Sequence, residues 1–186
     1  MEEKINSLYK ECIDELVSIG IPIDDEKTIG KIDIKISPRK TKRYGCCKQE
    51  NPDKTSSYRV KRRVYYKKYN NHHIEISKWL MDLNDDIIKN TIIHELIHCM
   101  PDCNNHGAMF KMYSNLINNR LGYNITRLGN KVEDYKKSNL EYKENISYKY
   151  KIVCKNCGHI YYRQRIVRNF LKKYCCSLCK GKLQIV

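Results

Sequence analysis

The stretch Asn90-Thr91-Ile92-Ile93-His94-Glu95-Leu96-Ile97-His98-Cys99 carries the pattern H-E-x-x-H inside an apolar run that favours a helix. Two histidines four residues apart face the same side of a helix, so both imidazoles can reach one metal ion. Glu95, next to the first histidine, can contact a water molecule on that metal. We expect Asn84 to cap the helix and Pro101 to end it after Met100. The pattern predicts a zinc site on a helix of about four turns.

The composition limits the classes of protein that need to be considered. The chain has 186 residues, a formal net charge of +15 and ten cysteines, which allows one main domain and a small appendage. It contains no run of eighteen apolar residues, and its first residues have no signal-peptide character. We therefore expect a soluble, cytoplasmic protein without membrane contact, whose cysteines stay reduced and bind metal where they are paired as C-x-x-C.

The positive charge favours an acidic partner such as nucleic acid. A second explanation stays open, because Lys, Asn, Ile and Tyr are all abundant, as an AT-rich coding sequence would make them without selection for binding.

The pattern of apolar residues predicts the elements around the zinc helix. Helical spacing predicts helices over Ile5 to Ile19 and from His106 to Gly122. Alternating or apolar runs predict strands over Lys31–Ile36, Arg43–Cys47, Tyr58–Tyr66 and His72–Ser77, with a polar turn over Gln49–Ser57. We therefore expect an α+β fold in which helices pack on a small mixed or antiparallel sheet.

The predicted strand His72–Ser77 runs directly into the zinc helix. Such a strand could form an edge against which an extended peptide pairs, main chain to main chain. We interpret His72 and His73 as exposed residues at the start of a core strand and do not count them as ligands.

Catalytic zinc usually takes three protein ligands and keeps a fourth position for water, so a third ligand is needed. The extended form H-E-x-x-H-x-x-G-x-x-H fails, because it needs glycine at Pro101 and histidine at Asn104. His106 lies eight residues beyond His98, after a break that lets the chain turn back toward the metal. Glu133 is the alternative, because a more distant glutamate serves in another zinc-protease pattern. We favour His106.

The segment His94-Glu95-Leu96-Ile97-His98, a short loop with Cys103 and Asn105, and then His106-Gly107-x-x-Phe110-Lys111 resemble the SprT-like family of zinc metallopeptidases. The resemblance continues in the strand Ile74–Ser77 before the helix and in a C-terminal ribbon. It implies a zincin-like α+β fold. It also implies a zinc ion held by His94, His98 and His106, with Glu95 as the catalytic residue.

Some members of that family cleave proteins covalently trapped on DNA, whereas many bacterial and viral relatives have no established substrate. The loop between His98 and His106 is shorter here than in the DNA-repair members. The resemblance therefore supports the assignment of the metal ligands more strongly than it supports a particular substrate.

The predicted reaction is metal-assisted peptide hydrolysis. Zinc would lower the pKa of its water, and Glu95 would take the proton during attack on the scissile carbonyl and return it to the leaving amine. Zinc and a donor that the sequence does not identify would stabilise the oxyanion. The competing hypothesis is a nucleic-acid-binding zinc protein with an inactive zincin-like core. An intact Glu95 argues against it, because structural zinc needs no base at that place.

Residues 130–147 are charged and Asn-rich without sustained periodicity, which predicts a linker. We expect a metallopeptidase domain over residues 1–140 and a zinc ribbon over residues 148–186. The ribbon contains two C-x-x-C knuckles separated by eighteen residues, formed by Cys154, Cys157, Cys176 and Cys179. A segment this short has too little core to fold without metal, so the second zinc is structural. A redox C-x-x-C would not explain the second pair.

Basic residues alternate with tyrosines between the knuckles. The basic candidates for nucleic-acid contact are Arg163, Arg165, Arg168, Lys172 and Lys173, and the aromatic ones are Tyr161, Tyr162 and Tyr174. Such surfaces bind phosphates and single strands. Lys61-Arg62-Arg63 with Lys67-Lys68 is a second basic cluster, and either cluster could instead be a solvated face.

The sequence therefore predicts a monomer with two zinc ions, one catalytic and one structural. We expect a protein substrate and a DNA partner, preferentially single-stranded. An adaptor that binds no nucleic acid is a third hypothesis, and it predicts metal in the ribbon without salt-sensitive DNA binding.

Overall fold

The computed structural model describes residues 1–38, 43–142 and 148–186. The chain forms two compact units, Met1–Tyr142 and Lys143–Val186, and each has its own cluster of buried apolar side chains. Both units are built from short helices and small sheets, so the fold is mixed α+β. Among the described residues, no helix is both long and apolar enough to cross a membrane.

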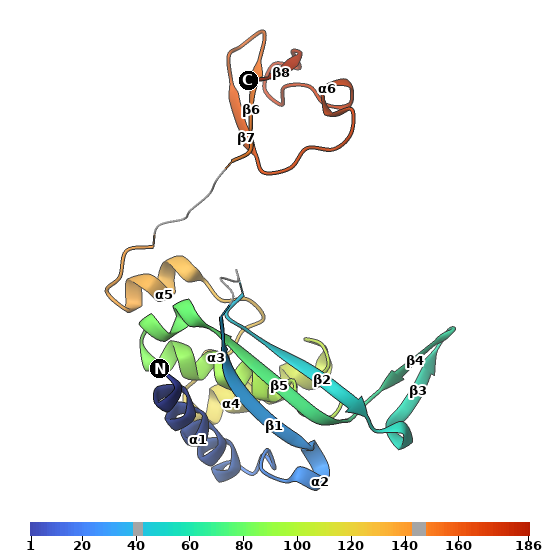
Figure 1. The fold of residues 1–186 in the computed structure, drawn as a ribbon, viewed down its shortest axis with the longest axis vertical. Helices are drawn as coiled ribbons and strands as arrows, with labels where there is room; N and C mark the ends of the chain where they lie inside the picture. The colour runs from blue at the N-terminus through green and yellow to red at the C-terminus, as the bar shows by residue number, and fades with distance from the viewer. Residues whose placement is uncertain (39–42, 143–147) are drawn as a thin grey trace. The chain divides into compact units, whose positions relative to one another are not determined.

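The first unit contains most of the regular structure (Figure 1). Its α-helices are α1 (Glu2–Ser18), α2 (Glu26–Ile29), α3 (Asp85–Ile97), α4 (Ala108–Leu121) and α5 (Lys131–Lys137). Its strands are β1 (Lys31–Ser37), β2 (Gly45–Pro52), β3 (Ser57–Val60), β4 (Arg63–Tyr66) and β5 (Tyr69–Ser77). Two short 3₁₀ turns are η1 (Lys54–Ser56) and η2 (Lys78–Asp82).

The main sheet has the strand order β1-β5-β2, with β5 parallel to β1 and antiparallel to β2. Ile74 of β5 lies beside Ile34 of β1 and Cys47 of β2, so apolar side chains share one buried face. Because β5 is the central strand, its main chain is paired on both sides. The expectation that the strand over residues 72–77 offers an edge to a peptide is therefore wrong, and among the described strands β1 and β2 form the edges of this sheet.

Two boundaries expected from the sequence are also wrong. Gln49–Pro52 is not a turn, because it continues β2 and pairs with the first half of β5. An edge strand that is largely exposed needs few apolar residues, so these polar positions gave no strand signal. The single strand expected over Tyr58–Tyr66 is a hairpin of β3 and β4 that turns at Lys61, whose φ is 56°. The hairpin extends away from the sheet (Figure 1).

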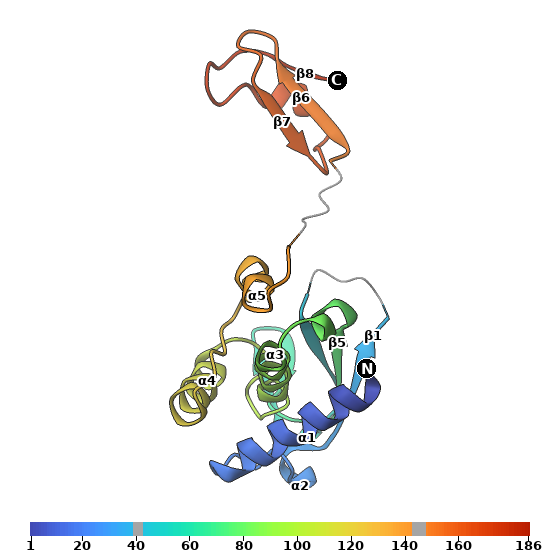
Figure 2. The same cartoon turned by 90° about the vertical axis from the view of Figure 1, so that its left-hand side faces the viewer.

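Helix α3 is the centre of the first unit. It contacts β2, β5, α1 and α4, and it lies between the sheet and α4 (Figure 2). A helix covered on several sides needs apolar residues around its circumference, and its buried positions are Ile87, Ile88, Thr91, Ile92, Ile93, Glu95, Leu96 and Ile97.

The helix ends at Ile97, three residues before the expected end. The backbone N–H groups of Cys99 and Met100 donate to Leu96 and Ile97 carbonyls three residues back, which tightens the chain before Pro101. Asn84 occupies the N-cap position, but its side chain donates to the Lys137 carbonyl at 3.0 Å instead of capping the helix.

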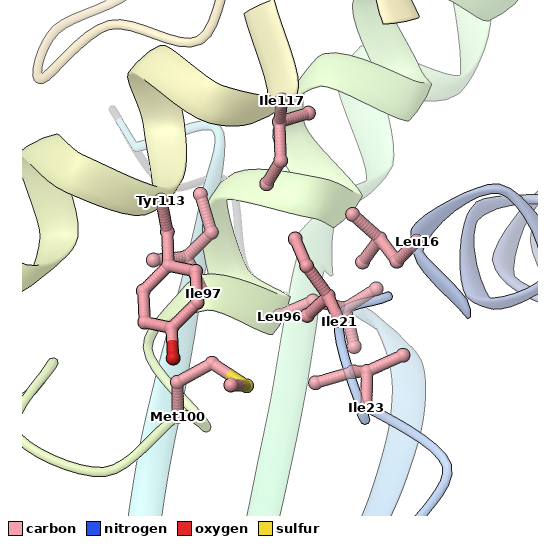
Figure 3. A pocket seen from close by; sticks show the side chains of 8 residues that line it. All are labelled: Leu16, Ile21, Ile23, Leu96, Ile97, Met100, Tyr113 and Ile117. Carbon is pink, nitrogen blue, oxygen red and sulfur yellow. The ribbon is translucent and has the colours of Figure 1, made fainter. Parts of the chain in front are cut away.

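Helices α1, α3 and α4 meet around an apolar gap with no room for a water molecule (Figure 3). The gap is lined by Leu16, Ile21, Ile23, Leu96, Ile97, Met100, Tyr113 and Ile117. We interpret it as part of the packed core, because it has neither polar groups beyond one tyrosine nor space for a ligand.

The linker predicted over residues 130–147 is wrong in its first part, because Lys131–Lys137 forms helix α5. Tyr135 stacks on Trp79 with ring centroids 6.0 Å apart, and Asp134 accepts a hydrogen bond from Tyr44. Lys131 Nζ lies 3.9 Å from the centroid of the Trp79 ring. The first part of the expected linker is therefore packed on the first unit through its aromatic residues. Residues 143–147 of that linker lie outside the described residues.

The second unit is a small sheet with the strand order β7-β6-β8. Its elements are β6 (Tyr150–Cys154), β7 (Ile160–Arg163), α6 (Phe170–Lys173) and β8 (Leu183–Ile185). Its buried hydrophobic cluster contains Ile152, Cys154, Cys176 and Leu183. Two of these four are cysteines, so the unit has little apolar core of its own.

We predict that Leu16→Ala lowers the free energy of unfolding of the first unit by about 2–5 kcal/mol, because it opens a cavity in a core that excludes water. Val17→Ala is the control, since Val17 is 40% exposed, and we expect it to cost less than about 0.5 kcal/mol. Trp79, the one tryptophan in the sequence, lies in this unit, so its fluorescence during urea unfolding measures that unit. Equal midpoints for the two variants would contradict this packing.

Candidate metal centres

Three histidines converge at the end of α3. His94 lies in the last turn of the helix and His98 is its C-cap. His106 comes back to them just before α4, and its Nε2 lies 3.0 Å from Nε2 of His94. One ring nitrogen from each of the three lies within 4.8 Å of the others. Two imidazole nitrogens on a tetrahedral zinc ion are about 3.3 Å apart, so the group suits such an ion.

Backbone carbonyls set the orientation of two of these rings. Nδ1 of His94 lies 3.0 Å from the Thr126 carbonyl oxygen, and Nδ1 of His98 lies 2.7 Å from that of Cys103. A carbonyl only accepts, so each Nδ1 must donate a proton, and the lone pair of the neutral ring is then on Nε2. This outer hydrogen bond is the usual support of a metal-binding histidine.

Phe110, at the start of α4, packs against all three rings. Its centroid lies 4.9, 4.8 and 4.7 Å from those of His94, His98 and His106. Phe110 is buried, so its ring limits the movement of the three imidazoles. The polar atoms of the group are the imidazole nitrogens.

The environment also keeps the histidines in the form that binds metal. Burial lowers the pKa of His94 to about 4, and the neighbouring His98 and His106 add to the shift. Burial is also the first cause that lowers the pKa of His98 and of His106. Each of these shifts favours the neutral imidazole, which is the state that ligates a metal.

The loop that returns the chain to His106 is held by side-chain amides. Gln49 of β2 donates to the His98 carbonyl at 2.6 Å and to Asn104 Oδ1 at 3.0 Å. Asn104 in turn donates to the Tyr66 carbonyl at 2.7 Å. These bonds fasten the loop to β2 and to the hairpin, so the position of His106 depends on the sheet as well as on the helix.

Glu95 lies on the side of α3 that faces β2 and is 6% exposed. A Cβ atom added to Gly45 of β2 would lie 3.0 Å from Glu95 Oε1, so a glycine at this position leaves room for the carboxylate. The pKa of Glu95 is raised to about 8, chiefly by burial; the negative charge of Cys47 contributes to the rise, and the Cys47 backbone N–H opposes it. A bound divalent cation would also lower it.

Glu133, the alternative third ligand, is exposed on α5 and is not part of the histidine group. Its backbone N–H donates to the Asn130 side chain, which caps that helix.

The four ribbon cysteines form a second group, with all sulfur atoms within 4.8 Å of one another. Cys154 Sγ lies 3.4 Å from Cys179 Sγ, and Cys157 Sγ lies 3.6 Å from Cys176 Sγ. Two thiolates on a tetrahedral zinc ion are about 3.8 Å apart. The donor atoms are thus spaced for one ion.

The two knuckles close in the same way. The N–H of Gly158 donates to the Cys154 carbonyl at 3.0 Å, and that of Lys180 donates to the Cys176 carbonyl at 2.9 Å. Gly158 and Lys180 both have a positive φ, 71° and 58°. Each C-x-x-C segment therefore forms a tight turn that points two sulfurs to one side. Cys175 lies outside the group.

The five basic residues predicted to contact nucleic acid are all exposed. The tyrosines differ from one another. Tyr161 is tied to the metal group, because its hydroxyl lies 3.1 Å from Cys176 Sγ and 2.9 Å from Ser177 Oγ. Tyr162 and Tyr174 are 46% and 52% exposed. Each of these two rings also has an aromatic neighbour, since Tyr162 lies 5.2 Å from Tyr148 and Tyr174 stacks on Phe170 with ring centroids 5.0 Å apart.

A hollow of about 570 Å³ lies on the second unit. Its lining residues are Lys155, Leu171, Lys172, Lys173, Tyr174, Cys175, Lys182 and Leu183. The hollow adds Lys155 and Lys182 to the basic residues that the sequence singled out.

Sequence reasoning missed one group of possible ligands in the first unit, Cys47, His72 and Cys99. His72 was expected to be exposed, but it is 1% exposed and lies beside Cys47. The three residues have no motif spacing, and only the pairing of β2 with β5 and the packing of α3 on these strands bring them together. His73 was also expected to be exposed, but it is partly buried in β5, where its ring nitrogen contacts the Asp33 carboxylate.

We predict that His106→Ala lowers the zinc content of the protein by about one equivalent, because it removes one of three ligands from the histidine group. Glu133→Ala should leave the zinc content unchanged. Elemental analysis of the purified variants measures this directly. Loss of zinc in Glu133→Ala alone would make Glu133 the third ligand.

The comparison with protein families agrees with this geometry. A family model described as the SprT-like family matches residues 16–129, which is more than half of the chain and contains His94, Glu95, His98 and His106. The four-cysteine group lies outside that range and is compatible with a zinc ribbon. No curated protein and no solved structure matches the chain. On the extent of the family match, the chain belongs to the SprT-like family.

Proposed function

We propose that the first unit is a zinc metallopeptidase of zincin-like type. The observation that carries the proposal is the convergence of three imidazoles, two of them oriented by backbone carbonyls, next to the buried carboxylate of Glu95 on α3. Membership of the SprT-like family supports a metalloprotease-like function.

His94, His98 and His106 would hold the ion through their ring nitrogens. When bound, zinc would lower the pKa of a water molecule and polarise the scissile carbonyl. Glu95 would take a proton from the attacking water on its carboxylate and deliver it to the nitrogen of the leaving amine. Burial of Glu95 limits competition from bulk water for that proton.

The substrate would lie along β2. This strand pairs with β5 on one side and forms an edge of the described sheet on the other, and its Gly45 lies against Glu95. An extended peptide added to such an edge is held by main-chain hydrogen bonds. Recognition would then depend on the peptide backbone, which suits a protease that accepts many sequences.

We further propose that the second unit binds DNA, preferentially single-stranded, and brings DNA-associated proteins to the active site. The support is the gathering of exposed positive charge beside two exposed tyrosines on a unit that metal would stabilise. Four lysines around the hollow add phosphate-binding capacity.

We predict that Glu95→Gln reduces peptide hydrolysis by at least about a hundredfold and keeps the zinc content, because it removes the base but no ligand. Glu133→Gln, the same change at an exposed position, should keep full activity. Casein cleavage and self-cleavage, with and without single-stranded DNA, provide the measurement. Zinc and DNA binding without cleavage by the unaltered protein would favour the alternative, a nucleic-acid-binding protein with an inactive core.

We predict that single-stranded DNA affinity falls steeply with salt, because binding to phosphates releases counterions. Replacing Arg163, Arg165 or Arg168 by Gln should reduce the log-log slope by about 0.7 to 1 unit for each phosphate that the variant no longer neutralises. Tyr162→Ala should cost about 1–3 kcal/mol at every salt concentration if a base stacks on that ring. Fluorescence anisotropy measures both effects.

Lys61→Gln in the hairpin of the first unit is the control for these variants. A loss of affinity in Lys61→Gln, with none in the arginine variants, would place the DNA-binding surface on the first unit. No binding by any of them would leave a protease without a DNA partner.

A further inference from the structure

A third cluster of metal-binding side chains lies in the first unit, separate from the histidine group. Cys47 comes from β2, His72 from β5 and Cys99 from the turn that follows α3. Cys47 Sγ lies 3.7 Å from Cys99 Sγ and 3.9 Å from Nδ1 of His72. The three donor atoms all lie within 4.8 Å of one another.

These separations suit a tetrahedral zinc ion. Thiolates bound at about 2.3 Å lie about 3.8 Å apart, and a thiolate and an imidazole nitrogen on the same ion lie about 3.6 Å apart. A disulfide requires a sulfur separation of about 2.05 Å. The two cysteines are therefore spaced for sharing an ion rather than for a bond to each other.

The imidazole of His72 is held in the orientation of a ligand. Its Nε2 lies 2.9 Å from the Ile29 carbonyl oxygen, which can only accept, so Nε2 carries the proton. In the neutral ring the lone pair is then on Nδ1, the atom that faces Cys47. A carbonyl behind the ring is the usual outer contact of a metal-binding histidine.

The charge of the occupant is limited by burial. His72 is 1% exposed and Cys99 is 3% exposed, so a large net charge would be costly at this place. Two thiolates, a neutral imidazole and a divalent ion sum to zero. Cu⁺ would leave a negative charge, and Mg²⁺ and Ca²⁺ prefer oxygen ligands. Sulfur and nitrogen donors with this charge therefore favour a divalent transition metal, and a tetrahedral site of this kind is typical of zinc.

We propose that Cys47, His72 and Cys99 bind a further zinc ion, in addition to the ions of the histidine and four-cysteine groups. Three protein ligands leave one position for a non-protein ligand. The ion would join the two strands of the sheet that face α3 to the end of that helix.

The position of this ion would connect it to the candidate active site. Cys47 lies two residues after Gly45, which abuts Glu95, and Cys99 directly follows His98. The ion would thus fasten the strand beside the candidate base to the helix end that carries a histidine ligand. Its binding does not depend on whether the protein hydrolyses peptides.

The test is the zinc content of the full-length protein, purified under reducing conditions with zinc present. Cys47→Ser should contain about one equivalent less zinc than Cys46→Ser. Cys46 is the matched control, because it is the neighbouring cysteine on β2 but lies outside the cluster, with its sulfur 4.0 Å from Glu75. The same difference between Cys47→Ser and Cys46→Ser should remain when each change is made separately in the His106→Ala protein. This result would separate the site from the proposed catalytic one.

Cobalt substitution gives an independent measurement. Six cysteine thiolates would bind cobalt in the unaltered protein, two here and four in the ribbon, and four would remain in Cys47→Ser. Thiolate-to-cobalt charge-transfer absorbance should therefore fall by about one third in Cys47→Ser and stay unchanged in Cys46→Ser. Trp79 fluorescence during unfolding shows whether each variant is folded, and Cys99→Ser replaces Cys47→Ser if it is not.

Equal zinc content and equal cobalt absorbance in folded Cys47→Ser and Cys46→Ser would overturn the proposal. Recovery of a Cys47–Cys99 disulfide from protein isolated without oxygen would overturn it as well, because the thiolates would then be unable to serve as ligands.

Discussion

The hydrogen bond from His98 Nδ1 to the Cys103 carbonyl, 2.7 Å long, is the contact on which the candidate active site depends most. It fixes the ring of one ligand, and it closes the turn that brings the chain back to His106. The turn has no regular structure of its own, so Gln49 and Asn104 hold it from β2 and the hairpin. His106, the candidate third ligand, is therefore placed by contacts between helix, loop and sheet.

The burial of α3 fixes the orientation of the helix on which these contacts depend. A helix packed against the sheet, α1 and α4 cannot rotate without opening gaps in a core that excludes water. His94 and His98 are the partly exposed positions near its end, whereas Glu95 is buried on the side of β2. The orientation of α3 that places these two histidines in the candidate metal group therefore also places the Glu95 carboxylate against the edge strand that we propose binds the substrate.

The two units reach stability in different ways. The first has a continuous apolar core from α1 to Ile125, whereas two of the four residues in the buried hydrophobic cluster of the second are cysteines of the candidate metal group. A bound ion would supply much of the folding free energy of the second unit. The surface of that unit can then carry many positive charges, since few surface residues are needed for packing.

The sequence alone was sufficient for features encoded by local spacing. The pattern from His94 to His98, the paired knuckles and the apolar period of α1 predicted a helix with two histidines on one side, a four-cysteine group and a packing helix, and the described residues contain all three. Only the tertiary structure decided that β5 is central, that α5 is packed on Trp79, and that Cys47, His72 and Cys99 meet. Strand order and contacts between distant segments depend on which buried surfaces fit together. The local periodicity of a single sequence predicts the type of an element but not its neighbours in space.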